Sequence, residues 1–262
     1  MNINYALQTC DKFNNQQITR YCSTNKNEVT KKCVTSFFNS IKYVSKIRPD
    51  DFHHITIFDD HSSEDCVKFL NKKCFEYSTN NIKVYLVQLK SGGIMNSIRS
   101  CYEWLKYSNA DLVYQVQDDY LFLDSAIYEL IDIFLQLKSD CKTDSIVIPF
   151  NSPTLWNDTY RYQSTPRTII PGVNRYWIQS YDIPCTFLTS HAQFIKHWGI
   201  LERFLEKSPT DERIEPDTLN KILTTRGVLG LLPISSIALH MQDNIIKDPY
   251  INWKFYWDEI VL

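Results

Sequence analysis

The fold is decided by Asp111-Leu112-Val113-Tyr114-Gln115-Val116-Gln117-Asp118-Asp119, an apolar strand pattern that ends in two adjacent aspartates. Upstream, the run Ile55-Thr56-Ile57-Phe58 ends in a second pair, Asp59-Asp60. Strands that release carboxylates at their C-terminal ends indicate one site at the carboxyl edge of a parallel sheet, where open α/β sheets bind ligands. Carboxylate oxygens suit a hard divalent cation and the phosphates that it carries. The first hypothesis is therefore chemistry on a nucleotide diphosphate.

The surrounding pattern alternates strands with amphipathic helices over residues 1–120. This alternation predicts an α/β fold with a mostly parallel sheet and helices on both faces. Strands are expected at 5–9, 54–58, 84–87 and 111–116, with helices at 31–43, from Ser62-Ser63 onward and at 96–107. Later we expect helices at 124–137, 191–206 and 217–223, strands at 145–150, 231–233 and 236–239, and a long loop over 151–176.

Composition argues against several classes of protein. The net charge is -2 and the pI about 6.3, so no basic footprint predicts nucleic-acid binding. No stretch reaches the ~20 apolar residues of a membrane span, and the N-terminus lacks the pattern of a signal peptide. We therefore expect a cytoplasmic protein with no membrane span, or one in the host cytoplasm if the source is viral rather than bacterial. Eight irregularly spaced cysteines fit buried hydrophobes better than disulfides or zinc ligands.

A glycine pair, Gly92-Gly93, follows one expected strand and precedes a helix. Glycines let the backbone approach a ligand closely, although the pair could also form a simple tight turn. The dinucleotide and P-loop glycine patterns are absent, which argues against those two nucleotide-binding classes. Arg99, in the following helix, could reach a phosphate or lie on the surface.

Five segments together resemble GT-A-fold glycosyltransferases, specifically the large family-2-like group. They are the segment from Ile57 to Asp65, the Ser91-Gly92-Gly93 turn with Arg99, Gln117-Asp118-Asp119, Glu215-Pro216-Asp217, and the run from Pro233 to His240. The resemblance is ordered and spans most of the chain. It implies a GT-A fold with a Rossmann-like, mostly parallel sheet in a single domain, in which residues 1–120 bind the nucleotide sugar and 121–262 complete the metal site and bind the acceptor. It further implies transfer of a hexose from a nucleotide-diphosphate sugar to a glycan hydroxyl, with inversion.

The resemblance implies a role for each segment in donor binding. Asp59 and Asp60 would accept hydrogen bonds from the base and ribose, although the same residues also suit a helix-capping loop. The nucleotide-sugar site would comprise Thr9, Asp59, Asp60, Gly92, Gly93, Arg99, Gln117 and Asp118.

The metal motif departs from the family's D-x-D pattern, because Gln117 stands in place of the first acid. By analogy with Glu-Asp-Asp versions, Asp119 would bind Mn²⁺ or Mg²⁺, and Asp118 would touch ribose or sugar hydroxyls. His240 follows a late strand, where the family places a metal-binding histidine, and imidazole suits Mn²⁺ beside carboxylates. The alternatives are a loop that caps the next helix and a structural histidine.

An inverting transferase needs a carboxylate that takes the proton of the acceptor hydroxyl. Asp217 is the sequence-based candidate and Glu215 the second choice; acids at this position could also cap a helix N-terminus. Sugars stack on aromatic rings, so Trp177, Tyr181 and Asp182 are predicted to bind the acceptor, although aromatic residues are also ordinary core material. The same middle segment contains Trp156, Tyr160, Tyr162 and Tyr176.

Two other functions fit the same pattern. A sugar nucleotidyltransferase is also α/β and metal dependent, but residues 1–30 lack the glycine that its N-terminal segment requires. A glycan-binding module without catalytic activity would tolerate Gln117 and the imperfect base segment.

Overall fold

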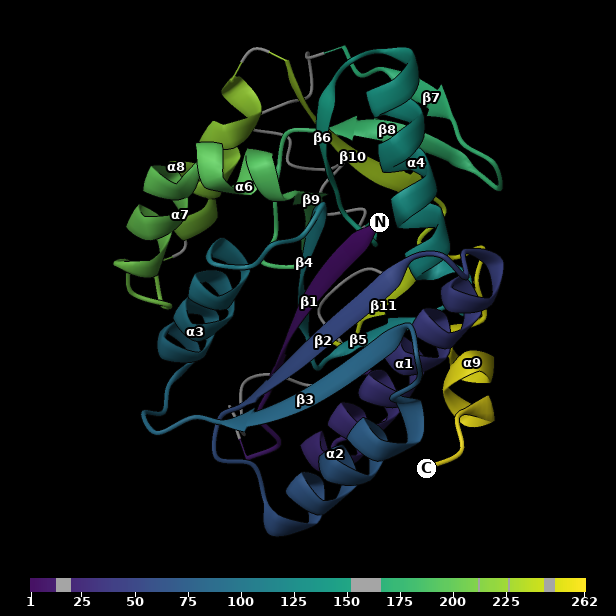
Figure 1. The fold of residues 1–262 in the computed structure, drawn as a ribbon, viewed down its shortest axis with the longest axis vertical. Helices are drawn as coiled ribbons and strands as arrows, with labels where there is room; N and C mark the ends of the chain where they lie inside the picture. Colours follow the sequence, from purple (N-terminus) through teal and green to yellow (C-terminus); the bar gives the residue numbers. More distant parts are fainter. Residues whose placement is uncertain (13–19, 152–165, 212, 226, 243–247) are drawn as a thin grey trace.

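The computed structural model describes residues 1–12, 20–151, 166–211, 213–225, 227–242 and 248–262. At their centre is a nine-stranded sheet (Figure 1). The strand order is β3-β2-β1-β4-β9-β6-β10-β8-β7, and among these strands only β9 and β8 run against the rest. The bounds are β1 Asn2–Thr9, β2 Phe52–Asp59, β3 Ile82–Gln88, β4 Leu112–Gln117, β6 Asp144–Val147, β7 Ile169–Pro171, β8 Tyr176–Ser180, β9 Phe187–Ser190 and β10 Val228–Ile234. The expected α/β fold with a mostly parallel sheet is confirmed.

The parallel half of the sheet brings the two aspartate pairs to one edge. In the register of this half, Thr9 of β1 lies opposite Asp59 of β2, and Gln8 lies opposite Gln117 of β4. Asp60 and Asp118 therefore emerge on either side of the end of β1. Their proximity follows from parallel pairing alone, because parallel strands end at the same edge.

Helices cover both faces of the sheet, as predicted. On one face α1 contacts α2 and α4, and on the other α3 contacts α6 and α7 (Figure 1). The bounds are α1 Lys26–Ile47, α2 Glu64–Tyr77, α3 Ile94–Lys106, α4 Ala126–Asp140, α6 His191–Lys196, α7 Trp198–Leu205, α8 Ile214–Asp217 and α9 Trp253–Glu259. Within the residues described above, no helix combines the length and apolarity required to cross a membrane.

The second half of the chain departs from the sequence-based expectations. The helix expected over 191–206 is interrupted at His197, which ends α6 and begins α7 and whose ring contacts Gln193 at 2.8 Å. The helix expected over 217–223 is a short α8 followed by a 3₁₀ turn, Leu219–Thr224. Strands β7 and β8 form a hairpin within and just beyond the expected loop at 151–176. These elements are too short for a periodic sequence pattern to show whether each is a helix or a strand.

A small two-stranded sheet completes the cavity edge. Strand β5, Tyr120–Phe122, pairs antiparallel with β11, Ala238–His240, and places His240 directly opposite Tyr120. Helix α9 packs its Trp253 and Trp257 onto this sheet and α1, and Lys32 Nζ donates to the Trp257 carbonyl at 2.8 Å. The C-terminal segment thus fixes the position of His240 relative to α1.

Because His53 is buried, with only 1% of it exposed, we expect the protein to lose stability in acid. The Nδ1 of His53 hydrogen bonds with the Tyr5 hydroxyl at 2.9 Å, and burial lowers the His53 pKa from 6.5 to about 4. The unfolded chain therefore binds a proton on His53 more tightly than the folded chain does. The contribution of the neutral His53 to the free energy of unfolding is complete above pH 6.5 and declines as the pH falls towards 4. Between about pH 7.5 and pH 4.5, urea unfolding of the wild type should lose about 2–3 kcal/mol more than that of His53→Asn. His61→Asn, at an exposed histidine, is the control; an equal acid loss in all three proteins would contradict the assignment to His53.

Candidate active site

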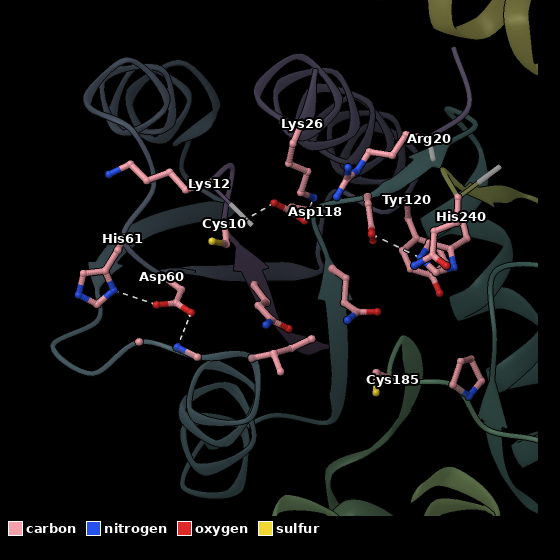
Figure 2. Close-up of a pocket in the computed structure, with 18 of the residues that line it drawn as sticks. Cys10, Lys12, Arg20, Lys26, Asp60, His61, Asp118, Tyr120, Cys185 and His240 are labelled. Carbon is pink, nitrogen blue, oxygen red and sulfur yellow. Dashed lines mark hydrogen bonds and ion pairs between the residues drawn. The ribbon is translucent and has the colours of Figure 1, made fainter. Parts of the chain in front are cut away.

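A cavity of about 870 Å³ opens at the carboxyl edge of the sheet, within the ~300–1,000 Å³ of typical ligand sites. Its walls come from the ends of β1, β2 and β4, the start of α1, the β5–β11 sheet and α8 (Figure 2). The structure brings together eight of the sequence-predicted residues as its lining: Asp60, Gly92, Gly93, Gln117, Asp118, Asp119, Glu215 and His240.

Only one aspartate of the first pair lines the cavity; the other is buried in the strand end behind it. Asp60 lines the cavity, where its carboxylate accepts from the Gly93 N–H at 2.8 Å and pairs with His61 Nδ1 at 2.8 Å (Figure 2). Asp59 is fully buried and accepts from Thr9 Oγ1 at 3.2 Å and from the Ser62 N–H at 3.3 Å. Burial raises the pKa of Asp59. Thr9 and Asp59 therefore shape the strand end, and Asp60 faces the cavity.

The glycine pair packs closely against Asp60. Gly93 has a φ of 111°, in the region that favours glycine. A Cβ added to Gly92 would lie 3.1 Å from Asp60 Oδ1. A larger residue at position 92 would crowd the Asp60 carboxylate, and one at position 93 would strain the backbone whose N–H donates to that carboxylate.

Asp118 connects β4 to the start of α1. Its carboxylate accepts from Lys26 Nζ at 2.6 Å, from Thr30 Oγ1 at 2.8 Å and from the Cys10 N–H at 2.9 Å. These three donors occupy much of its capacity, so a sugar hydroxyl would compete with them. Sequence analysis missed Lys26; its signal is a lysine in the first turn of a helix, where the macrodipole disfavours a positive charge.

Asp119 and His240 meet across the two sheets. His240 Nε2 lies 3.4 Å from Asp119 Oδ2, and the imidazole stacks on Tyr120 with ring centroids 4.6 Å apart (Figure 2). Burial alone would raise the pKa of Asp119, but the positive charges of His240, Lys26 and Arg20 outweigh it and hold the pKa well below its usual range. Asp119 is therefore a carboxylate at every physiological pH.

The side chains of Asp119 and His240 suit a divalent cation that enters the cavity together with substrate phosphates. The second oxygen of Asp119 is buried and has no hydrogen-bond partner among the described residues, as expected of a ligand atom. In that same part of the chain, no three His, Cys, Asp or Glu side chains lie close enough to hold a metal by themselves. Mg²⁺ is often bound by one or two carboxylates together with substrate phosphates, and this donor set suits that arrangement.

The geometry reverses the sequence-based order of the two base candidates. Glu215 lines the cavity, and burial raises its pKa, as does the charge of Asp182, while His240 opposes the rise. Asp217 does not line the cavity, and both of its oxygens are paired with Arg213, at 2.8 and 3.1 Å. That hydrogen-bonded pair lowers the pKa of Asp217. Residues two positions apart on α8 point in different directions, and the sequence-based helix, expected to begin at Asp217, did not include Glu215.

Four other predicted residues lie outside the cavity lining. Trp177 is 1% exposed and belongs to the core, so it cannot stack on a sugar. Tyr181 donates to the Pro166 carbonyl at 3.0 Å, and Asp182 accepts from the Asn220 side chain. Arg99 donates to the Leu205 carbonyl at 3.1 Å and so joins α3 to α7 instead of reaching a phosphate. Trp156, Tyr160 and Tyr162 fall outside the described residues, and the cavity lining also includes Phe150, Pro184 and Cys185.

Solved structures share this fold. The chain is similar to the crystal structure of residues 1–349 of S. aureus TarS, with a TM-score of 0.51 and 15% identity, over 91% of this chain and 60% of that one. A longer TarS structure gives a TM-score of 0.52 and 16% identity, over 90% of this chain and 36% of that one. The chain thus spans well under two thirds of the TarS structures that it matches. At this identity the likeness shows the shared fold alone, a mixed α/β fold with a large, mostly parallel sheet flanked by helices.

The chain matches no protein-family model and no curated protein.

Proposed function

We propose that this protein is a glycosyltransferase that moves a hexose from a nucleotide-diphosphate sugar to a glycan hydroxyl, with inversion at the anomeric carbon. One observation carries the proposal: a single cavity on a GT-A-type sheet gathers Asp60, the Asp119–His240 pair and Glu215. This set offers hydrogen-bond acceptors, a partial cation site and a base, which are the groups that the reaction needs.

The donor would enter at the carboxyl ends of β1, β2 and β4. The carboxylate of Asp60 would accept hydrogen bonds from the nucleoside, and the backbone at Gly92 and Gly93 leaves room for it. Asp119 and His240 would hold Mg²⁺ or Mn²⁺ with the diphosphate. When bound, the cation supplies Lewis-acid stabilisation of the leaving diphosphate.

Glu215 would act as the base. In the proposed step the acceptor oxygen forms a bond to the anomeric carbon, and the bond from that carbon to the diphosphate oxygen breaks. The acceptor proton passes to the Glu215 carboxylate, and the electron pair of the broken bond leaves on the diphosphate. A raised pKa makes the Glu215 carboxylate a stronger base than that of an exposed glutamate.

The first test is a thermal-shift panel of UDP, GDP, TDP and CMP, each with Mn²⁺ and with EDTA. Ligand binding stabilises the native state, so one diphosphate should raise the midpoint, and more so with Mn²⁺. A shift with none of them would contradict the proposed function. Pyrophosphate release from a nucleoside triphosphate would instead indicate a nucleotidyltransferase, and sugar binding without transfer would indicate a glycan-binding module.

A further inference from the structure

Two basic side chains share the cavity edge with Asp118 and Asp119. Lys26 and Arg20 are 7% and 8% exposed and both line the cavity. Figure 2 shows the Arg20 side chain extending towards Lys26 and Asp118. A backbone bridge from Arg20 to Gln242 holds this segment beside the strand that carries His240. The chain therefore builds a cationic pair next to the partial cation site.

The position of Lys26 is unfavourable for a purely structural lysine. It is the first residue of α1, where the helix dipole disfavours positive charge, and burial disfavours the ammonium as well. Although burial lowers the pKa of Lys26, the charges of Asp118 and Asp119 outweigh it and raise the pKa overall. The lysine is thus held charged in a place where a neutral residue would be easier to bury.

The charge balance indicates the ligand. Lys26 and Arg20 carry two positive charges and Asp118 and Asp119 two negative charges, so the charges of these four side chains cancel. A divalent cation on Asp119 and His240 would make it positive, which suits a diphosphate. An ammonium has three donors, of which Asp118 accepts one, and a guanidinium has a planar fork that matches phosphate oxygens.

We propose that Lys26 and Arg20 bind the donor's diphosphate directly, so that preference for a diphosphate persists in part without the metal. The inference rests on the proposed function and extends it to two residues that the D-x-D pattern does not include. As the sugar–oxygen bond breaks, negative charge grows on the diphosphate, and fixed cations beside it stabilise that charge.

The test measures affinity as a function of phosphate number. Calorimetry at one low salt concentration would compare uridine, UMP and UDP, and in parallel guanosine, GMP and GDP, each with Mn²⁺ and with EDTA. The variants are Lys26→Met, Arg20→Gln and the double variant Lys26→Met/Asp118→Asn, which leaves no unpaired buried carboxylate if Lys26→Met alone folds poorly. Lys42→Met, an exposed lysine on the same helix, is the matched control.

In EDTA, wild type and Lys42→Met should bind the diphosphate about tenfold more tightly than the nucleoside. This margin in affinity is what one hydrogen bond to a charged group contributes. Lys26→Met, the double variant and Arg20→Gln should lose that margin, and in the two single variants the nucleoside affinity should stay within about twofold. An unchanged margin in the variants would overturn the inference, as would a wild-type margin that vanishes in EDTA. Equal losses for nucleoside and diphosphate would also overturn it, because they would show that Lys26 only positions Asp118. If no nucleotide binds wild type in either condition, the proposed function itself fails.

Discussion

Replacing Asp119 with alanine is expected to lower kcat/KM by about a thousandfold, because the donor's cation would lose the Asp119 carboxylate as a ligand. Asp119 is ionised, is placed 3.4 Å from His240 and has a second oxygen without a hydrogen-bond partner among the described residues. The backbone carbonyl of Asp119, which accepts from the Met241 N–H at 2.8 Å, is retained in the variant. The loss should therefore be chemical and not a collapse of the β5–β11 sheet.

The measurement is product formation across a Mn²⁺ titration. Asp119→Ala should need far more Mn²⁺ and remain slow at saturation. Asp124→Ala, which removes an exposed carboxylate from the same segment, is the control and should behave as wild type. Full turnover in Asp119→Ala with unchanged metal dependence would remove the proposed mechanism.

Replacing Glu215 with glutamine is expected to lower kcat by about 10²–10⁴-fold, the range for loss of a general base. The amide keeps the size of the side chain but takes no proton, so the affinity for the nucleotide diphosphate should change little. Asp217→Asn is the matched control, because Asp217 lies two residues away on the same helix and is paired with Arg213 outside the cavity. A large loss in Asp217→Asn with an active Glu215→Gln would restore the order that the sequence suggested.

The pH profile gives an independent test of Glu215. Its base form is the carboxylate, so kcat/KM should fall as the pH drops through its pKa. Because burial and the nearby Asp182 raise that pKa, against the opposing charge of His240, the fall should begin at a higher pH than for an exposed glutamate. Cys185, whose thiol lies 4.0 Å from Glu215 Oε1, has a pKa raised well above its usual value by burial, so it stays neutral throughout this range. A profile without this acidic limb would contradict the assignment.

Local sequence patterns predicted the strands and helices of residues 1–120 well. The strands that end at Asp59 and Gln117 have clear apolar patterns, and α1 to α3 have clear amphipathic periods. In the second half, the chain turns back through short strands and helices, and their identity depends on partners distant in sequence. β5, for example, has only three residues, and its antiparallel partner β11 lies more than a hundred positions later.

Sequence patterns were sufficient to predict the α/β class and the carboxyl edge where Asp60, Asp118 and Asp119 gather, because these follow from period, strand direction and residue type. The folded chain was needed to show which acid faces the cavity, that Trp177 belongs to the core, and that Lys26 and Arg20 join the aspartates. Those outcomes depend on side-chain direction and on contacts such as Lys26 to Asp118, 92 residues apart, which no local pattern encodes.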